Sequence, residues 1–317
     1  MLFSISMKRN AEGKDDHRMK HLKNTVCATI APMNEDGSID LDSTIQLIRF
    51  LLDKGISCFY PNGTNGESLS LSIREREEIA LAVKTTVDSS GTVFIQCGAA
   101  SVMESQENIR RARQIEADGI GIMSPVFFPC DDHALEEVLR ILLSFAEGVP
   151  SYLYNIPSRT GTDISAPMLS HLMKDFPSLL GIKYSAPDLL RVQDYLRLSP
   201  RSCDVLIGCD RLALAHMAVG GSGWVSGPAA AFAELFAALD QAVINSDQAQ
   251  AMAVIRRIEE ISSAIAGIPE IPAIKYLLVQ RGIIQCDYCR RPLRPLTAQE
   301  KTVLDSVLES YTASLPT

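Results

Sequence analysis

The feature that most limits the fold of this chain is an eightfold alternation of short apolar runs and amphipathic segments. The apolar runs are rich in β-branched and aromatic residues, whereas the segments between them place apolar residues at i, i+3 and i+4. The eight predicted strands are 26–30, 56–60, 93–97, 119–123, 151–154, 180–184, 205–207 and 223–225. The predicted helices that follow the first seven are 41–54, 74–87, 103–116, 133–147, 166–174, 189–198 and 211–219.

Strands that are apolar throughout are typical of parallel sheets, which are buried on both faces. Alternating strands and helices build βαβ units, and eight units over about 220 residues predict an α/β fold of the closed (β/α)8 barrel type. The alternative is a doubly wound open sheet, which favours a Gly-x-Gly-x-x-Gly turn after its first strand. The sequence there is Ile30-Ala31-Pro32-Met33-Asn34, so the barrel is the favoured fold.

The pattern divides the chain into three regions. Residues 1–21 are polar and mixed in charge and are predicted to form a flexible N-terminal tail. Residues 22–245 are predicted to form the barrel, and residues 246–317 a C-terminal helical region without further strands. The helices expected from the end of the barrel onward are 234–243, 248–264, 272–281 and 298–311.

Composition excludes several classes of protein. A net charge of −8 over 317 residues argues against a nucleic-acid partner, because such binding needs a cationic face. No apolar run approaches the roughly 20 residues of a membrane span, and the N-terminus has no apolar signal segment, so we expect a cytoplasmic protein. Most of the eight cysteines lie in apolar runs, as reduced core residues do. Cys286 and Cys289 lack the second pair or nearby histidines of a zinc site.

Active-site residues of a barrel lie at the carboxyl ends of its strands, and Lys183 is the only charged residue in the sixth strand. Burial disfavours an ammonium group and lowers its pKa, which leaves a free amine that can form a Schiff base with a ketone. The alternative is a lysine that only extends along a strand end toward water. The pattern alone leaves both readings open.

Other strand ends carry weaker signals. Tyr154 ends the fifth strand, where a phenol could transfer protons, and Arg159 follows it with a guanidinium suited to a carboxylate. The pattern alone favours a core aromatic residue and a surface arginine. Thr64 and Asn65 follow the second strand between two glycines, where backbone N–H groups could bind a small anion. The polar run 131–133 is interpreted as the cap of the fourth helix rather than a metal site.

Four segments in this order resemble the dihydrodipicolinate synthase / N-acetylneuraminate lyase family. The likeness extends over about 22–308, nearly the whole chain, and each segment falls at a predicted strand end. The segments are Gly63-Thr64-Asn65-Gly66-Glu67, Tyr154-Asn155-Ile156-Pro157-Ser158-Arg159-Thr160-Gly161, Gly181-Ile182-Lys183 and Gly208-Cys209-Asp210.

The resemblance implies a barrel with C-terminal helices, commonly a homotetramer built from dimers, that acts as a class I pyruvate aldolase or a related synthase or dehydratase. It implies that Lys183 forms an imine with pyruvate or another 2-oxo acid, without a metal or a dissociable cofactor. Thr64 and Asn65, with the backbone near Val225, would hold the carboxylate of the substrate, and Tyr154 would relay protons. Arg159, in turn, would bind a carboxylate of the second substrate, an aldehyde.

Departures from the family pattern narrow this expectation. Where this chain has Phe127, the synthases usually have a tyrosine that takes part in a proton relay with the tyrosine of the fifth strand. The synthases also have a threonine in place of Asn65 and Glu-Ala in place of Tyr184-Ser185. The sequence therefore predicts a paralogue rather than a true 4-hydroxy-tetrahydrodipicolinate synthase. The alternatives are an aldolase or dehydratase of 2-keto-3-deoxy sugar acids and a non-catalytic barrel that binds a 2-oxo acid.

Overall fold

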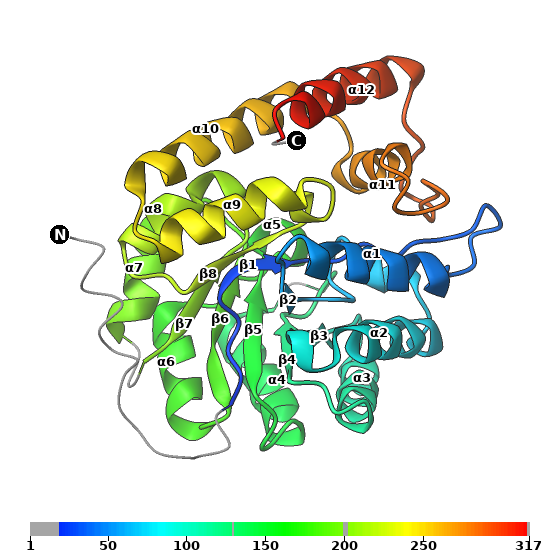
Figure 1. The fold of residues 1–317 in the computed structure, drawn as a ribbon. Helices are drawn as coiled ribbons and strands as arrows, with labels where there is room; N and C mark the ends of the chain where they lie inside the picture. The colour runs from blue at the N-terminus through cyan, green and yellow to red at the C-terminus, as the bar shows by residue number, and fades with distance from the viewer. Residues whose placement is uncertain (1–18, 129, 199–201, 316–317) are drawn as a thin grey trace.

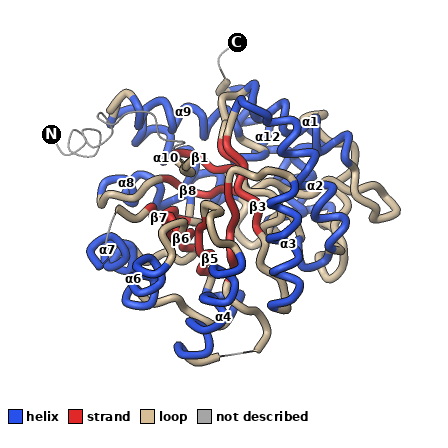
Figure 2. Tube along the Cα trace, turned by 90° about the horizontal axis from the view of Figure 1, so that it is seen from below, coloured by secondary structure: helices blue, strands red, loops and turns tan. Residues whose placement is uncertain are grey.

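The computed structural model describes residues 19–128, 130–198 and 202–315, and within them the chain forms a closed (β/α)8 barrel (Figure 1). Each strand is parallel to its neighbours, and β1 pairs with β8 to close the sheet. Viewed after a quarter turn, the strands occupy the centre and helices surround them (Figure 2). The predicted barrel is confirmed. The strands are β1 Asn24–Cys27, β2 Cys58–Phe59, β3 Thr92–Gln96, β4 Gly119–Met123, β5 Ser151–Asn155, β6 Leu179–Tyr184, β7 Asp204–Ile207 and β8 Gly223–Ser226.

The helices follow the predicted order, with one short addition after β5. Helix α5 has only four residues, too few to show a periodicity in the sequence. Asp131 caps α4 by accepting a hydrogen bond from the backbone N–H of Ala134, as the polar run predicted. The helices are α1 Leu41–Asp53, α2 Ile73–Val87, α3 Val102–Gln114, α4 Asp132–Phe145, α5 Pro157–Thr160, α6 Ala166–Asp175, α7 Leu189–Leu198, α8 Ala213–Ala218, α9 Ala233–Ile244, α10 Gln248–Ala264, α11 Glu270–Gln280 and α12 Ala298–Ala313.

Large aromatic side chains fill the inside of the barrel, and glycines in β4 make room for them. Tyr60, Phe94 and Tyr152 are fully buried in this interior cluster. A Cβ atom on Gly121 would lie 1.7 Å from the hydroxyl of Tyr60, and one on Gly119 would lie 2.1 Å from the ring of Phe94. The small residues of β4 are therefore required by the packing of the neighbouring strands.

A one-residue bulge in β6 decides which of its side chains enter the barrel. Ser151 pairs with Leu179, but Tyr152 pairs with Gly181, so Leu180 is skipped in the register. Strict alternation would place Leu180 and Lys183 on opposite faces of the sheet. With the extra residue, Leu180 packs in the interior and Lys183 also points into the barrel, against the ring of Tyr60.

The C-terminal helices lie across one end of the barrel, where α10 and α12 pass above α9 in Figure 1. At the opposite end of the strands, Lys20 pairs with Asp118 at 3.0 Å and His21 with Asp204 at 2.5 Å. Residues 1–18 of the predicted tail lie outside the described residues. Within the described part of the chain, no helix is long and apolar enough to cross a membrane.

Candidate active site

A cavity of about 450 Å³ opens at the carboxyl ends of the barrel strands. Its walls come from the loops after the strands and from the end of α10, the start of α11 and the connection between them, including Ser262, Gly267 and Glu270. All six residues singled out in the sequence lie in its wall and are therefore brought together by the fold. They are Thr64, Asn65, Tyr154, Arg159, Lys183 and Val225.

Lys183 is the most deeply placed charged group of the cavity, with 4% of its surface exposed. Burial lowers the pKa of Lys183, while the neighbouring Tyr154 acts in the opposite direction without cancelling the effect. The amine lies over two aromatic rings, 3.9 Å from the centroid of Tyr154 and 4.6 Å from that of Tyr60. A larger fraction of Lys183 is therefore unprotonated and nucleophilic near neutral pH than for a lysine in water.

Tyr154 lies beside Lys183 because β5 and β6 pair these two residues directly. Its hydroxyl is 3.2 Å from the hydroxyl of Thr64. Burial alone would raise the pKa of Tyr154, but the positive charge of Lys183 and hydrogen bonds from Thr64 and Ser185 outweigh it and lower the pKa. A phenol of this kind gives up and regains a proton more easily than an ordinary tyrosine.

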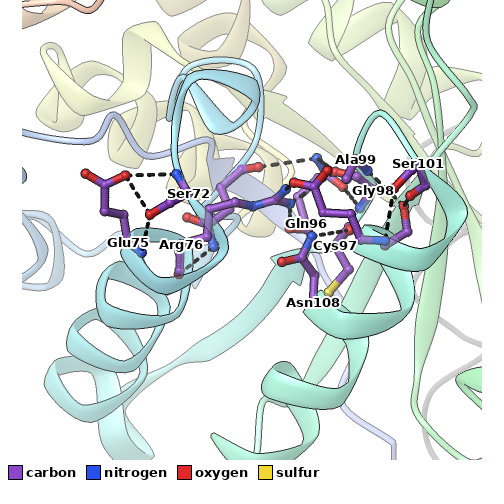
Figure 3. A network of polar contacts seen from close by, with 12 residues as sticks. Ser72, Glu75, Arg76, Gln96, Cys97, Gly98, Ala99, Ser101 and Asn108 are labelled. Atoms are coloured by element: carbon purple, nitrogen blue, oxygen red, sulfur yellow. Dashed lines mark hydrogen bonds and ion pairs between the residues drawn. The ribbon is translucent and has the colours of Figure 1, made fainter.

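The loop that carries Thr64 and Asn65 is held in place by a buried polar network between β3 and α2. Asn62 adopts a left-handed conformation with φ +60° and donates through its side chain to the carbonyl of Arg76 at 2.9 Å. Arg76 in turn donates to the carbonyls of Gln96 and Gly98, each at 3.1 Å (Figure 3). These contacts link residues 14 to 22 positions apart in sequence, and no local pattern indicates them.

Arg159 and Val225 lie on different sides of the cavity. Arg159 is exposed near the end of α5, and no described carboxylate pairs with it, so its guanidinium is available to a ligand. Val225 is 5% exposed in β8, directly opposite Val26 of β1. The arginine lies at the rim of the cavity and the valine lies deep in the barrel.

Three polar residues of the cavity were not assigned roles in the sequence analysis. Ser185 hydrogen-bonds Tyr154, and Glu270 accepts a 3.4 Å hydrogen bond from the side chain of Asn65. Burial raises the pKa of Asp210 to about 7, although a hydrogen bond from Ser226 opposes that shift. Glu270 is 205 residues from Asn65, and only the folded chain brings the two together.

Phe127 does not line this cavity and is 84% exposed. It adopts a left-handed conformation with φ +75°, and its ring stacks edge-on against Phe128 at 5.0 Å. Within the described part of the chain, no three His, Cys, Asp or Glu side chains are grouped as metal ligands. Cys286 and Cys289 are both free thiols.

A closed (β/α)8 barrel with a buried lysine in the cavity at its carboxyl end has the architecture of a barrel enzyme. The chain belongs to the dihydrodipicolinate synthetase family, whose model matches residues 21–311. It is 29% identical over 292 residues to a 4-hydroxy-tetrahydrodipicolinate synthase of Pelodictyon phaeoclathratiforme, covering 92% of this chain and 98% of that protein. It is 36% identical over 211 residues to the N-acetylneuraminate lyase of Rattus norvegicus, covering 65% of this chain and 66% of that protein.

Solved structures show the same fold. A dihydrodipicolinate synthase from Aquifex aeolicus superposes with a TM-score of 0.87 at 24% identity, covering 93% of this chain and 100% of that chain. A Proteus mirabilis N-acetylneuraminate lyase superposes with a TM-score of 0.85 at 25% identity, covering 92% of this chain and 99% of that chain. The chain is an enzyme of the lyase class.

Proposed function

We propose that this enzyme makes or breaks a carbon–carbon bond next to the keto group of pyruvate or a related 2-oxo acid, through an imine on Lys183. The observation that carries the proposal is the position of Lys183, which is buried, has a lowered pKa and touches the hydroxyl-bearing ring of Tyr154. A desolvated lysine is the nucleophile that imine chemistry needs near neutral pH.

The chemistry proceeds in steps that the cavity residues can assist. The amine of Lys183 adds to the keto carbon, and the carbinolamine then loses water to give a protonated imine. The imine draws electrons from the neighbouring carbon, which loses a proton and becomes an enamine. The enamine carbon attacks the carbonyl carbon of an aldehyde, and water releases the product and restores the amine. Tyr154 moves the protons in these steps, because its hydroxyl lies beside Lys183 and its pKa is lowered.

Two groups of residues would orient the substrates. Thr64 and Asn65, with the backbone near Val225, would bind the carboxylate of the 2-oxo acid, and all three residues line the same cavity as Lys183. The cavity of about 450 Å³ is larger than pyruvate needs, which leaves room for a second substrate. The unpaired guanidinium of Arg159 suits an aldehyde that carries its own carboxylate.

We propose a paralogue of 4-hydroxy-tetrahydrodipicolinate synthase rather than that enzyme itself. Phe127 offers no hydroxyl to the proton relay, and its exposed side chain lies outside the cavity of the single chain. Ser185 supplies a hydroxyl next to Tyr154 where the synthases have alanine. Low activity with aspartate semialdehyde, raised by Phe127→Tyr, would support this assignment, and full activity in the wild type would refute it.

The experiment that tests the proposed reaction is a screen of aldehydes with pyruvate, followed by mass spectrometry of the products and a reverse assay for pyruvate release. The expected result is a condensation product with at least one aldehyde that is lost in Lys183→Ala. Elimination of water from a sugar-derived acid without pyruvate release would instead indicate a dehydratase that uses the same lysine. Binding of 2-oxo acids without turnover of any partner would contradict the proposal and indicate a non-catalytic barrel.

A further inference from the structure

A buried ion pair lies behind the wall of the cavity, between Glu67 and Lys275. The carboxylate and the ammonium are 2.5 Å apart, and their side chains are 1% and 0% exposed. Neither residue lines the cavity. Two charges removed from water are stable only if further hydrogen bonds satisfy them.

The segment 286–290, which contains the Cys-x-x-Cys pattern, supplies those hydrogen bonds. Lys275 donates to the carbonyl of Tyr288 at 2.7 Å, and the backbone N–H of Arg290 donates to Glu67 at 2.8 Å. The thiol of Cys289 also hydrogen-bonds Glu67, and burial raises its pKa to about 12. The segment therefore encloses the ion pair.

The ion pair is joined to the turn that carries Thr64 and Asn65. The backbone N–H of Glu67 donates to the carbonyl of Thr64 at 3.0 Å and closes the turn. Glu67 itself adopts a left-handed conformation with φ +52°, which a non-glycine residue keeps only when its surroundings hold it. The position of its carboxylate thus fixes the end of the turn.

Helix α11 contacts this turn at two points. Lys275 binds Glu67, and Glu270, the first residue of the helix, accepts the hydrogen bond from Asn65. Both contacts connect residues more than 200 positions apart. The C-terminal helical region therefore supports the turn in addition to the hydrogen bonds of Asn62 and Arg76.

We infer that Glu67 and Lys275 are positioning residues, which hold Thr64 and Asn65 in the orientation that binds the carboxylate of the 2-oxo acid. The inference rests on the proposed function, since it assigns that carboxylate to the turn. An ion pair that only stabilised the fold could be replaced by neutral side chains without changing substrate affinity. An ion pair that positions the turn cannot be replaced in this way, because the turn would relax without the two charges and the substrate affinity would fall.

The test compares Glu67→Gln, Lys275→Met and the double variant with the wild type. The double variant removes both charges at once, so that no unpaired charge remains buried. The matched control is Asp175→Asn with Arg140→Met, an ion pair of 2.6 Å between α6 and α4 whose side chains are 53% and 36% exposed and do not line the cavity. Each protein is incubated with increasing pyruvate and borohydride, and the trapping rate gives a half-saturation concentration and a maximum rate. Melting temperature is recorded in parallel.

In the double variant we expect the half-saturation concentration to rise about tenfold or more, while the maximum trapping rate changes by less than about threefold. The control pair should match the wild type in both quantities. A folded double variant with wild-type half-saturation would overturn the inference and leave the ion pair with a structural role only. If the double variant does not fold, Glu67→Asp, which keeps both charges but shortens the side chain that carries the carboxylate by one methylene, decides the question by the same two quantities.

The same data separate the two proposals. If the wild type is trapped and the folded variants have an unchanged half-saturation concentration, the inference is overturned but the proposed function stands. Absence of trapping in the folded wild type refutes the proposed function and the inference that rests on it.

Discussion

Gly227 lies opposite Asn65, and replacing it with alanine would displace the amide that we assign to carboxylate binding. The backbone at Gly227 has φ −78° and ψ −49°, which any residue adopts, so alanine brings no backbone strain. Its Cβ, however, would lie 1.7 Å from the amide nitrogen of Asn65 and 2.9 Å from the carbon that bears it. Real Cβ atoms essentially never come within 3.0 Å of another heavy atom, so the amide nitrogen must move by about 1.3 Å.

A displacement of this size has a large effect on binding and a small one on folding. Misplacing a binding group by 1 Å can cost about 10²-fold, so we expect the half-saturation concentration of pyruvate to rise about 10- to 100-fold in Gly227→Ala. Asn65 is only half-buried, and the melting temperature should therefore change little. The assay is borohydride trapping over a range of pyruvate concentrations, with a thermal melt on the same samples.

A double variant tests whether the collision with Asn65 causes the loss of pyruvate affinity. Asn65→Ala removes both atoms that collide with the new Cβ, so Gly227→Ala should have no additional effect in that background. Unchanged pyruvate affinity in Gly227→Ala would refute the reasoning. So would a double variant in which the two effects simply multiply, because the methyl group would then act somewhere other than on Asn65.

We expect three further variants to change proton transfer, the pH dependence of stability and the packing of the barrel interior. Tyr154→Phe keeps the ring over Lys183 but lacks the hydroxyl, so trapping should slow by about 10²- to 10⁴-fold with an unchanged melt, and a wild-type rate would contradict the assigned proton transfer. Burial raises the pKa of Asp240 to about 7 in the folded protein, so stability of the wild type should fall as pH rises from about 4 to 7. The free energy of unfolding of Asp240→Asn should therefore rise by up to about 4 kcal/mol relative to that of the wild type over that range. The prediction is contradicted if the urea midpoints of the two proteins differ by the same amount at pH 5 and at pH 8. Gly121→Ala should cost about 1–3 kcal/mol in urea unfolding through the collision with Tyr60, and an unchanged midpoint would show that the ring can move away.

The barrel could be predicted from sequence because each of its strands and helices is marked by a local sequence pattern. Each strand is a short apolar run and each helix a periodic segment, so eight repeats of the unit identify the fold and place Lys183 and Tyr154 at strand ends. Pairing of β5 with β6 then puts these two residues side by side, as the barrel order requires.

The remaining features of the site depend on contacts between distant residues. The bulge at Leu180, which turns Lys183 into the barrel, is a property of the pairing with β5 and has no signature in the strand itself. Glu67 and Lys275 are separated by 208 positions, and no local pattern connects them. Cys286 and Cys289 lack the partners of a zinc site and the sequence gives Cys289 no role, whereas the structure places it against Glu67. Such contacts follow from packing in three dimensions rather than from local periodicity.

Borohydride trapping with pyruvate is the most direct test of the proposal that Lys183 forms an imine with a 2-oxo acid. Reduction converts the imine into a stable secondary amine, which intact mass and peptide mapping detect and locate. We expect one pyruvyl adduct on Lys183 that is absent from a folded Lys183→Ala variant. No adduct with pyruvate or other 2-oxo acids in a folded sample, or an adduct on another lysine, would contradict it.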